Sequence, residues 1–296
     1  MGILDGKVAV ITGAGRGLGR SHAVMLASQG ASVVVNDLGG ELDGAGGSRS
    51  PAGEVVAEIR AAGGRAVANY DDVSSWQGAE RLVRRAIEEF GQLDILVNNA
   101  GILRDRMCFN MGEEDWDSVM RVHLKGHFAP IRFACTYWRE RHKAGKPISG
   151  KIVNTASEAG VIGNAGQANY SAAKAGILAL TMVIAREMEK YGINVNAIAP
   201  RAVTRMTETL FRAFGEEAMT QLEPASVSAL VAYLVSEEAA HINGQAFVIY
   251  GGLIQLLQGW HPIASIEKTG TWSLPEVQTR LAELFQGAPS KLAPLG

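Results

Sequence analysis

The stretch that decides the fold is "TGAGRGLG", residues 12–19. It follows the apolar run "KVAVIT" (7–12) and opens a segment with helical periodicity. In a turn between a strand and a helix, Gly13 permits the tight bend, Gly17 lets the backbone approach a pyrophosphate, and Gly19 allows the helix to pack closely on the strand. The stretch therefore predicts a phosphate-binding turn at the start of a β-α unit.

Short β-branched, apolar runs alternate with longer helical segments along most of the chain. The runs are residues 7–12, 31–36, 64–70, 94–99, 150–157, 193–200 and 245–252. The helical segments between them are 17–29, 53–62, 76–90, 113–142 and 171–190. This alternation predicts an α/β fold, a Rossmann-type, doubly wound parallel sheet of about seven strands with helices on both faces. We expect one domain over 1–252 and an extension over 253–296 that packs on the domain or on a neighbouring subunit.

An acidic residue ends the second predicted strand and points to the kind of nucleotide that the turn binds. Asp37 follows the turn by about 20 positions, where a carboxylate can accept both hydroxyls of an adenosine ribose. The same charge would repel a 2′-phosphate, and the next residue is Leu38 rather than a basic one, although Arg16 could be argued to favour NADP. We therefore expect NAD as the cofactor; the alternative is that Asp37 only caps a turn.

Composition narrows the class of protein. The 296 residues carry a net charge of −2 and are 47% hydrophobic, which gives no broad attraction to nucleic acid or anionic membranes. Two cysteines, Cys108 and Cys135, are too few for a disulfide framework and have no metal-ligand spacing. Residues 1–6 lead directly into a strand-like run, and no apolar stretch of spanning length is evident. We expect a cytoplasmic protein that binds no metal, nucleic acid or membrane.

A second motif, "YSAAK" (170–174), pairs a phenol with an ammonium group. At positions i and i+4 of a helix, Tyr170 and Lys174 share a face. A nearby positive charge favours the phenolate, so we expect Lys174 to lower the pKa of Tyr170 from about 10 and let it act as an acid or base. The alternative is an ordinary exposed Tyr and Lys.

In this order the motifs resemble the short-chain dehydrogenase/reductase family over residues 5–252. "TGAGRGLG" is similar to its glycine turn, "DDV" (71–73) to its adenine-side segment, "NNAG" (98–101) to its fourth-strand motif, and "YSAAK" to its active site. The resemblance implies that Ser157, 13 residues before Tyr170, hydrogen-bonds the reacting oxygen while Lys174 also holds the nicotinamide ribose. It further implies cofactor contacts from Gly13, Arg16, Gly17, Leu18, Gly19, Asp37, Asp72, Val73, Asn99, Ala100, Gly101, Tyr170, Lys174, Pro200 and Thr204.

Two positions depart from the family pattern. His123, in "VHLKG" (122–126), stands where the family usually has an asparagine that bends the helix and anchors a water leading to the lysine. A neutral imidazole can hold such a water, and with an unperturbed pKa near 6.5 it would lose that ability in acid, so we expect oxidation to fall below neutrality. The alternative is that His123 only packs at the bend and donates to a backbone carbonyl. Arg201 replaces the usual glycine after Pro200.

Several stretches, including "VVVNDLGG" (33–40), "NNAGILRDR" (98–106) and "GNAGQANYSAAKAG" (163–176), are similar to one branch of the family. This branch is the (3R)-hydroxyacyl-CoA dehydrogenase domain of peroxisomal multifunctional enzymes and its free-standing bacterial relatives, which implies a hydroxyacyl-CoA substrate and a role in lipid metabolism. A steroid or other alicyclic secondary alcohol is the alternative substrate. A nucleotide-binding scaffold or sensor without turnover is the alternative of a different class.

Two expectations concern partners. Arg104, Arg106, Arg201 and Arg205 could meet the phosphates of CoA, or they are surface arginines. The segment 171–190 is apolar around much of its circumference, more than one sheet face can cover. We therefore expect a homo-oligomer, a tetramer by resemblance or a dimer, that buries this segment and the one at 113–142.

Overall fold

The computed structural model describes residues 2–41, 43–202, 222–259 and 261–286. It divides into two compact units, Met1–Leu257 and Gln258–Gly296, which are considered separately below. Thr204 and Arg205, two of the residues named from the sequence, lie outside the described ranges.

The first unit is built on one eight-stranded sheet with the order β3-β2-β1-β4-β5-β6-β7-β8. Its parallel strands are β1 (Val8–Thr12), β2 (Ser32–Asn36), β3 (Arg65–Asn69), β4 (Ile95–Asn98), β5 (Lys151–Thr155), β6 (Asn194–Pro200) and β7 (Ala246–Tyr250). The predicted doubly wound parallel sheet is confirmed. The direction in which strands are added reverses between β1 and β4, and ligands of such sheets bind at this switch point, beyond the carboxyl ends of the strands.

The eighth strand was not expected. β8 (Leu253–Leu257) pairs antiparallel with β7 through a tight turn at Gly251 and Gly252, so the first five residues assigned to the extension belong to the sheet. The sequence did not predict this strand, because the alternation of strands and helices stops after the last parallel strand and the apolar residues that follow were assigned to the extension. Ile254 and Leu256 on β8 are exposed in the single chain.

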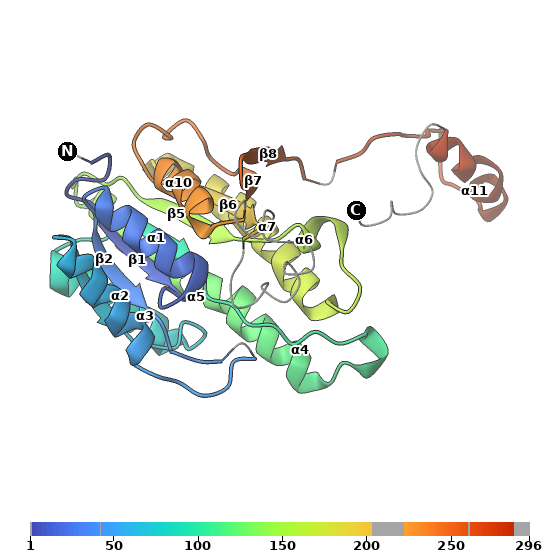
Figure 1. Ribbon diagram of the computed structural model, residues 1–296. Coiled ribbons are helices and arrows are strands. Elements are labelled where there is room, and N and C mark those ends of the chain that lie inside the picture. The colour runs from blue at the N-terminus through green and yellow to red at the C-terminus, as the bar shows by residue number, and fades with distance from the viewer. Residues whose placement is uncertain (1, 42, 203–221, 260, 287–296) are drawn as a thin grey trace. The chain divides into compact units, whose positions relative to one another are not determined.

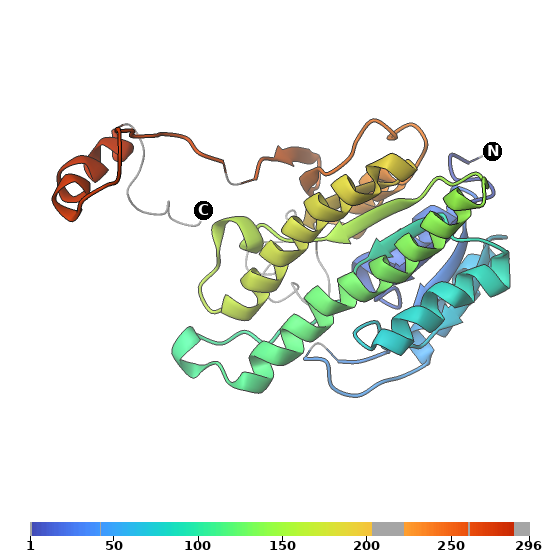
Figure 2. The ribbon, with the colours of Figure 1, turned by 180° about the vertical axis from the view of Figure 1, so that it is seen from behind.

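Helices cover both faces of the sheet (Figure 1). One face carries α1 (Gly17–Ser28), α2 (Ser50–Ala61) and α10 (Pro224–Leu234), which enclose a core that includes Leu26, Ile59 and Val231. The other face carries α3 (Trp76–Phe90), α5 (Gly126–Lys143) and α7 (Ala168–Met188), as the view from behind shows (Figure 2). Their core includes Leu82, Ile131 and Ile184. Both layers follow from strands that are apolar on both sides.

The segment expected as one helix at 113–142 is interrupted. It consists of α4 (Glu113–Val119), a π-helical turn η2 (Met120–Lys125) and α5. π-Helical turns are rare and occur often at functional sites. His123 lies in this turn and is only 2% exposed, so the position that departs from the family pattern coincides with the irregularity.

The remaining short elements of the first unit are η1 (Cys108–Asn110), α6 (Ala159–Ile162) and η3 (Glu189–Tyr191). Together with η3, α7 forms an apolar helix over Ala168–Tyr191 whose length and composition would allow it to cross a membrane, a property that core helices of soluble proteins share. Met182 and Val183 on this helix are 42% and 48% exposed in the single chain.

The second unit contains α11 (Leu274–Arg280) and the 3₁₀ turn η4 (Leu281–Phe285), where the sequence shows one helical pattern. A capping box starts α11, in which Glu276 accepts hydrogen bonds from the backbone N–H and the hydroxyl of Ser273. Arg280 and Lys268 lie over the ring of Trp272, at 5.1 and 5.6 Å from its centre. How this unit packs remains a prediction.

Candidate active site

The glycine turn has the backbone geometry that its sequence predicts. Gly13 and Gly17 have φ angles of +61° and +53°, a region that side chains disfavour. A Cβ on Gly19 would lie 2.1 Å from the carbonyl oxygen of Gly13, so only glycine lets α1 approach β1 this closely. A Cβ on Gly13 would lie 2.8 Å from the Cα of Ala100. The turn is therefore fitted against both its own helix and the end of β4.

Two polar side chains fix the turn to β4. The Asn99 amide donates to the carbonyl oxygens of Thr12 and Gly13, both at 3.1 Å. In return the Thr12 hydroxyl accepts from the backbone N–H groups of Asn99 and Ala100, at 2.9 and 3.1 Å. The role of Thr12 was not predicted, although its position at the end of β1, beside the glycine turn, pointed to it.

Asp37 closes the same turn from β2. Its carboxylate accepts the backbone N–H of Gly15 at 2.7 Å and that of Gly39 at 2.6 Å. This is the turn-capping role considered as an alternative, and it does not compete with ribose binding, because a carboxylate offers about four acceptor sites. A Cβ on Gly15 would lie 2.8 Å from the Asp37 carboxylate, so the close contact depends on glycine.

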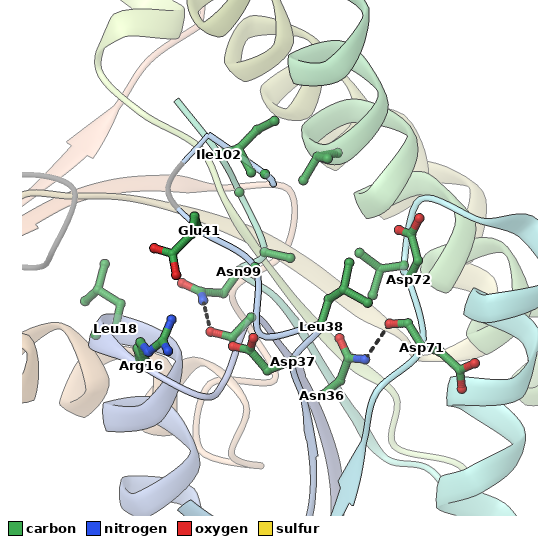
Figure 3. A pocket seen from close by; sticks show the side chains of 18 residues that line it. Arg16, Leu18, Asn36, Asp37, Leu38, Glu41, Asp71, Asp72, Asn99 and Ile102 are labelled. Carbon is green, nitrogen blue, oxygen red and sulfur yellow. Dashed lines mark hydrogen bonds between the residues drawn. The ribbon is translucent and has the colours of Figure 1, made fainter. Parts of the chain in front are cut away.

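These residues surround a pocket of about 240 Å³ at the switch point of the sheet (Figure 3). Gly44, from the glycine-rich segment after β2, also borders it. Of the residues predicted to bind the cofactor, the pocket is lined by Gly13, Arg16, Gly17, Leu18, Asp37, Asp72, Val73, Asn99, Ala100 and Gly101. Further lining residues were not predicted from the sequence; these are Asn36, Leu38, Gly40, Glu41, Asp71, Ile102 and Val122. Gly19 is buried in α1 and Pro200 ends β6, and neither is among the residues that line the pocket.

In the "YSAAK" motif the Lys174 side chain is buried beside the end of β5, whereas Tyr170 is only partly buried. Lys174 is 2% exposed, and its ammonium donates to the carbonyl oxygen of Thr155 at 2.6 Å and lies 5.3 Å from the centre of the Tyr170 ring. The Ser157 hydroxyl accepts from the backbone N–H of Ala159 at 3.2 Å. A side-chain hydrogen bond between Ser157 and Tyr170 lowers the pKa of Tyr170, but by less than burial raises it. The structure thus brings the predicted acid–base residues together.

The protonation of these groups differs from the expectation. Burial raises the pKa of Tyr170 to about 12, opposed by Ser157 and reinforced by the charge of Asp105. Burial also lowers the pKa of Lys174 to about 7. The predicted lowering of the Tyr170 pKa is therefore wrong, because burial disfavours the charged form of both groups and so weakens the positive charge that the prediction assumed.

His123 is held by the segment that follows β4. Its Nε2 lies 3.1 Å from the backbone nitrogen and 2.8 Å from the carbonyl oxygen of Ile102, and its ring is perpendicular to that of Tyr170 at 5.2 Å. A Cβ on Gly101 would lie 2.4 Å from the imidazole, so Gly101 makes room for the ring.

The protonation of His123 near neutral pH, on which the expected acid dependence was based, is contradicted, whereas the pH dependence of activity stays a prediction. Burial, assisted by Lys174, lowers its pKa well below 6.5, so the ring stays neutral where the loss of activity was expected. The contacts of Nε2 with the backbone of Ile102 agree with the alternative, in which His123 packs at the helix bend and donates to a backbone carbonyl. The buried Nδ1 has no hydrogen-bond partner among the residues that the structure describes, so it could still hold a water.

Asn169, which the sequence analysis did not select, fixes the start of α7. The side chain is fully buried and donates to the carbonyl oxygens of Arg104 and Asp115, at 3.0 and 2.9 Å. Its Oδ1 accepts the backbone N–H of Tyr170 at 2.7 Å. An asparagine before the motif tyrosine gave no signal by itself, because its partners are 54 and 65 positions away in the sequence.

The arginines proposed for CoA are engaged with the protein. Arg201 makes a two-point ion pair with Glu158, at 2.5 and 2.8 Å, and its guanidinium lies 4.7 Å from the centre of the Tyr250 ring. Arg104 donates to the carbonyl oxygen of Asp43 at 2.9 Å, and Arg106 donates to that of Asp105 at 2.8 Å. Arg201 therefore joins the residue after Ser157 to the end of β6.

Comparisons with known proteins agree with this arrangement. The chain matches the family model described as "short chain dehydrogenase" over residues 7–214. It is 47% identical over 294 residues to hydroxyacyl-CoA dehydrogenase ChsB1 of Mycobacterium tuberculosis, covering 96% of this chain and 90% of that one. It is 45% identical over 262 residues to peroxisomal multifunctional enzyme type 2 of Mus musculus, covering 88% of this chain and 34% of that one. A crystal structure of a short chain dehydrogenase from Mycobacterium avium has a TM-score of 0.88 and 48% identity and covers 99% of both chains.

Proposed function

Because the chain belongs to the short-chain dehydrogenase/reductase family, we propose that it is an NAD-dependent enzyme that interconverts a 3-hydroxyacyl-CoA and its 3-ketoacyl-CoA. The fold, the family match and the relatives make it an oxidoreductase. The substrate class rests on relatives that are named for hydroxyacyl-CoA chemistry or for peroxisomal multifunctional enzymes at 45–47% identity.

The choice of NAD rests on Asp37, the observation that carries the cofactor assignment. Enzymes of this family use NAD or NADP. In this chain a carboxylate fixed by Gly15 and Gly39 borders the pocket, and the exposed Leu38 follows it. A 2′-phosphate in this corner would meet a fixed negative charge, whereas two ribose hydroxyls would find acceptors. The glycine turn also fits a dinucleotide cofactor. A Cβ at Gly13, Gly15 or Gly19 would collide with atoms that surround the turn, so these positions admit only glycine.

The residues of the site have distinct tasks. Bound NAD would supply the acceptor for the hydride that leaves the carbinol carbon. Ser157 would orient the reacting oxygen by a hydrogen bond, and Tyr170 would take the proton of the alcohol or give one to the ketone. With its pKa raised to about 12, the Tyr170 phenol keeps its proton at neutral pH and can act as the acid. We therefore expect alcohol oxidation to accelerate as the pH rises.

The proposed enzyme acts as a homo-oligomer. The outward faces of α5 and α7 expose Phe128, Met182 and Val183, of which each is at least 40% exposed in the single chain. Large apolar side chains that long helices leave exposed are often covered by a neighbouring subunit. Sedimentation of the purified protein tests this part of the proposal, and a monomer at micromolar concentration would contradict it.

The decisive test is an absorbance assay for NADH with a panel of 3-hydroxyacyl-CoA thioesters, steroid alcohols and terpenoid alcohols, each offered with NAD and with NADP. We expect the thioesters with NAD to give the highest kcat/KM. If only the steroid alcohols were oxidised, the substrate class would be steroid alcohols instead of 3-hydroxyacyl-CoA thioesters, and the proposed reaction type would still hold. A preference for NADP would overturn the role given to Asp37.

A further inference from the structure

The connection between β2 and α2 forms one side of the cofactor pocket. It spans residues 37–49, whereas connections of this kind usually have about 2–6 residues, and those longer than about 12 are often functional. Gly40, Glu41 and Gly44 of this connection line the pocket (Figure 3). We call its described residues 38–41 and 43–49 the pocket wall. The position of the pocket wall therefore sets the shape of the pocket on this side.

The pocket wall is folded on itself but is poorly buried. The backbone N–H of Ser48 donates to the carbonyl oxygen of Leu38 at 3.1 Å, and that of Glu41 donates to the carbonyl oxygen of Ala45 at 2.8 Å. Residues 43–49 are all exposed, so little apolar burial fixes them in place. The position of the pocket wall then depends on the contacts that its tip, Asp43 and Gly44, makes with the rest of the domain.

The tip contacts the segment that follows β4. A Cβ on Gly44 would lie 3.3 Å from the side chain of Ile102, so this glycine fits closely against the isoleucine. Beside this contact, Nε of Arg104 donates to the carbonyl oxygen of Asp43 at 2.9 Å, across 61 positions in the sequence. Residues 102–104 therefore support the pocket wall from the opposite side of the pocket.

Arg104 is held more firmly than the tip that it contacts. The fully buried side chain of Asn169 donates to the carbonyl oxygen of Arg104 at 3.0 Å. The guanidinium of Arg104 is 3.8 Å from the carboxylate of Asp115, and the Arg104 side chain is only 24% exposed. A fixed donor thus meets an exposed tip, so the hydrogen bond to Asp43 restrains the tip rather than the arginine.

We propose that Arg104 is a positioning residue for the cofactor, which holds the pocket wall in its binding position before the cofactor arrives. This proposal rests on the proposed function, because it takes NAD as the ligand of the pocket. Arg104 is not among the residues that line the pocket, so it acts through Asp43 and Gly44. A wall that is already ordered lowers the entropic cost of binding, so NAD binds more tightly and leaves more slowly.

Hydrogen exchange of the ligand-free protein tests the pocket wall directly, with mass spectrometry of a peptide that covers residues 38–48. Arg104→Ala should increase exchange in this peptide by about two- to tenfold, the usual contribution of one hydrogen bond. Arg104→Lys keeps a positively charged donor and should restore part of the protection. Unchanged exchange in Arg104→Ala would overturn the proposal.

Arg106 provides the matched control for this measurement. It lies two residues further along the same segment, and its side chain donates to the carbonyl oxygen of Asp105 at 2.8 Å. Arg106→Ala removes the same charge and should leave the exchange of the pocket wall unchanged. An equal increase in Arg104→Ala and Arg106→Ala would mean that the whole segment had loosened, and would overturn the proposal.

Cofactor binding supplies the second readout. In Arg104→Ala, NADH release measured by stopped-flow fluorescence should accelerate by about two- to tenfold, and NAD affinity measured by calorimetry should weaken by a similar factor. At saturating NAD, kcat with the best alcohol should not fall, because Asn169 binds the main chain of Arg104, which the substitution leaves in place. A lower kcat with unchanged NADH release, or a raised KM for thioesters alone, would overturn the proposal.

Gly44→Ala perturbs the same contact from the other side and replaces Arg104→Ala if that variant does not fold. Its Cβ would press on Ile102, so exchange of the pocket wall should also increase. In the double variant the increase should be smaller than the product of the two single effects, since both changes break one shared contact. Independent effects would contradict this arrangement. Because exchange and NADH release require no turnover, a blank substrate screen with the expected changes would reject the proposed reaction and leave the role of Arg104 standing.

Discussion

The cofactor end and the catalytic end of this site are built on different physical grounds. At the cofactor end, backbone groups define the pocket, and glycines at 13, 15 and 19 matter because a Cβ has no room. At the catalytic end, side chains that ionise are buried among polar atoms, and burial sets their protonation. Backbone geometry is determined by residue type and is therefore predictable from a motif, whereas a pKa depends on everything that surrounds the group.

The largest effect should come from the catalytic end. Tyr170→Phe removes only the hydroxyl, so the fold and NAD binding should remain while kcat falls by roughly 10²–10⁴-fold, the usual contribution of a general acid–base group. Stopped-flow absorbance of NADH measures the loss, and protein fluorescence titration measures NAD affinity. Retention of more than about a tenth of kcat would remove Tyr170 from the proton transfer.

A substitution at the cofactor end should change the affinity for the cofactor rather than the rate of the chemical step. Asp37→Ala should weaken NAD binding by about 10–100-fold, since hydrogen bonds to a charged group contribute about 1.5–3 kcal/mol, and should change NADP binding far less. Isothermal titration with both cofactors gives the two affinities. Because Asp37 also caps Gly15 and Gly39, Asp37→Asn serves as the control that keeps one acceptor oxygen. Equal losses for NAD and NADP would show that the carboxylate only holds the turn.

The same difference between backbone geometry and buried ionisable groups separates what could be predicted from the sequence from what could not. The parallel doubly wound sheet, the glycine turn, Asp37 and the pairing of Tyr170 with Lys174 were predictable, because each depends on the local alternation of strands and helices or on a known motif. The roles of Thr12 and Asn169 were not, since their partners come from distant segments. The pKa of Tyr170 is shifted in the direction opposite to the prediction, and the lowered pKa of Lys174 was not predicted. The motif gives the spacing of the two groups but not the depth of their burial.

Both ends also contain buried histidines that link stability to pH. His22 at α1 and His127 at α5 have pKa values of about 3, and that of His123 lies well below 6.5. In the unfolded chain each ring binds a proton near pH 6.5, whereas the folded chain stays neutral, so the folded state loses stability as the pH falls from about 6.5 toward 3.

Each such histidine contributes a slope of up to about 1.4 kcal/mol per pH unit, roughly tenfold in the folding equilibrium. His22→Phe should therefore flatten the decline between pH 6 and 4 by up to about 1.4 kcal/mol per pH unit, with urea denaturation at fixed pH as the measurement. The slope should be reduced equally by His127→Phe, even though the two residues lie at different ends of the site. A slope that neither variant changes would mean that the rings titrate in the folded protein.

The smallest effect concerns the ion pair that connects the catalytic turn to the sheet. Glu158 and Arg201 are 23% and 46% exposed, and partly exposed pairs contribute about 0.5–1 kcal/mol. If the pair positions the turn of Ser157, Glu158→Gln and Arg201→Gly should each lower kcat by about two- to fivefold, and the exchange Glu158→Arg with Arg201→Glu should recover part of the loss. No recovery, with a raised KM for thioesters, would indicate that Arg201 contacts the CoA phosphates instead.

The sheet order has a consequence for the time course of folding. The β1–β4 ladder that closes the pocket pairs Ala9 with Ile95, residues far apart in the chain, whereas β7 and β8 form a local hairpin around Gly251 and Gly252. Local hairpins form in about 1–10 μs, while non-local parallel pairing is slow because a long loop must close first. The hairpin can therefore form long before the cradle for the cofactor exists. NAD added to the unfolded chain should not accelerate the early steps of refolding, but it should stabilise the protein once β4 has joined β1.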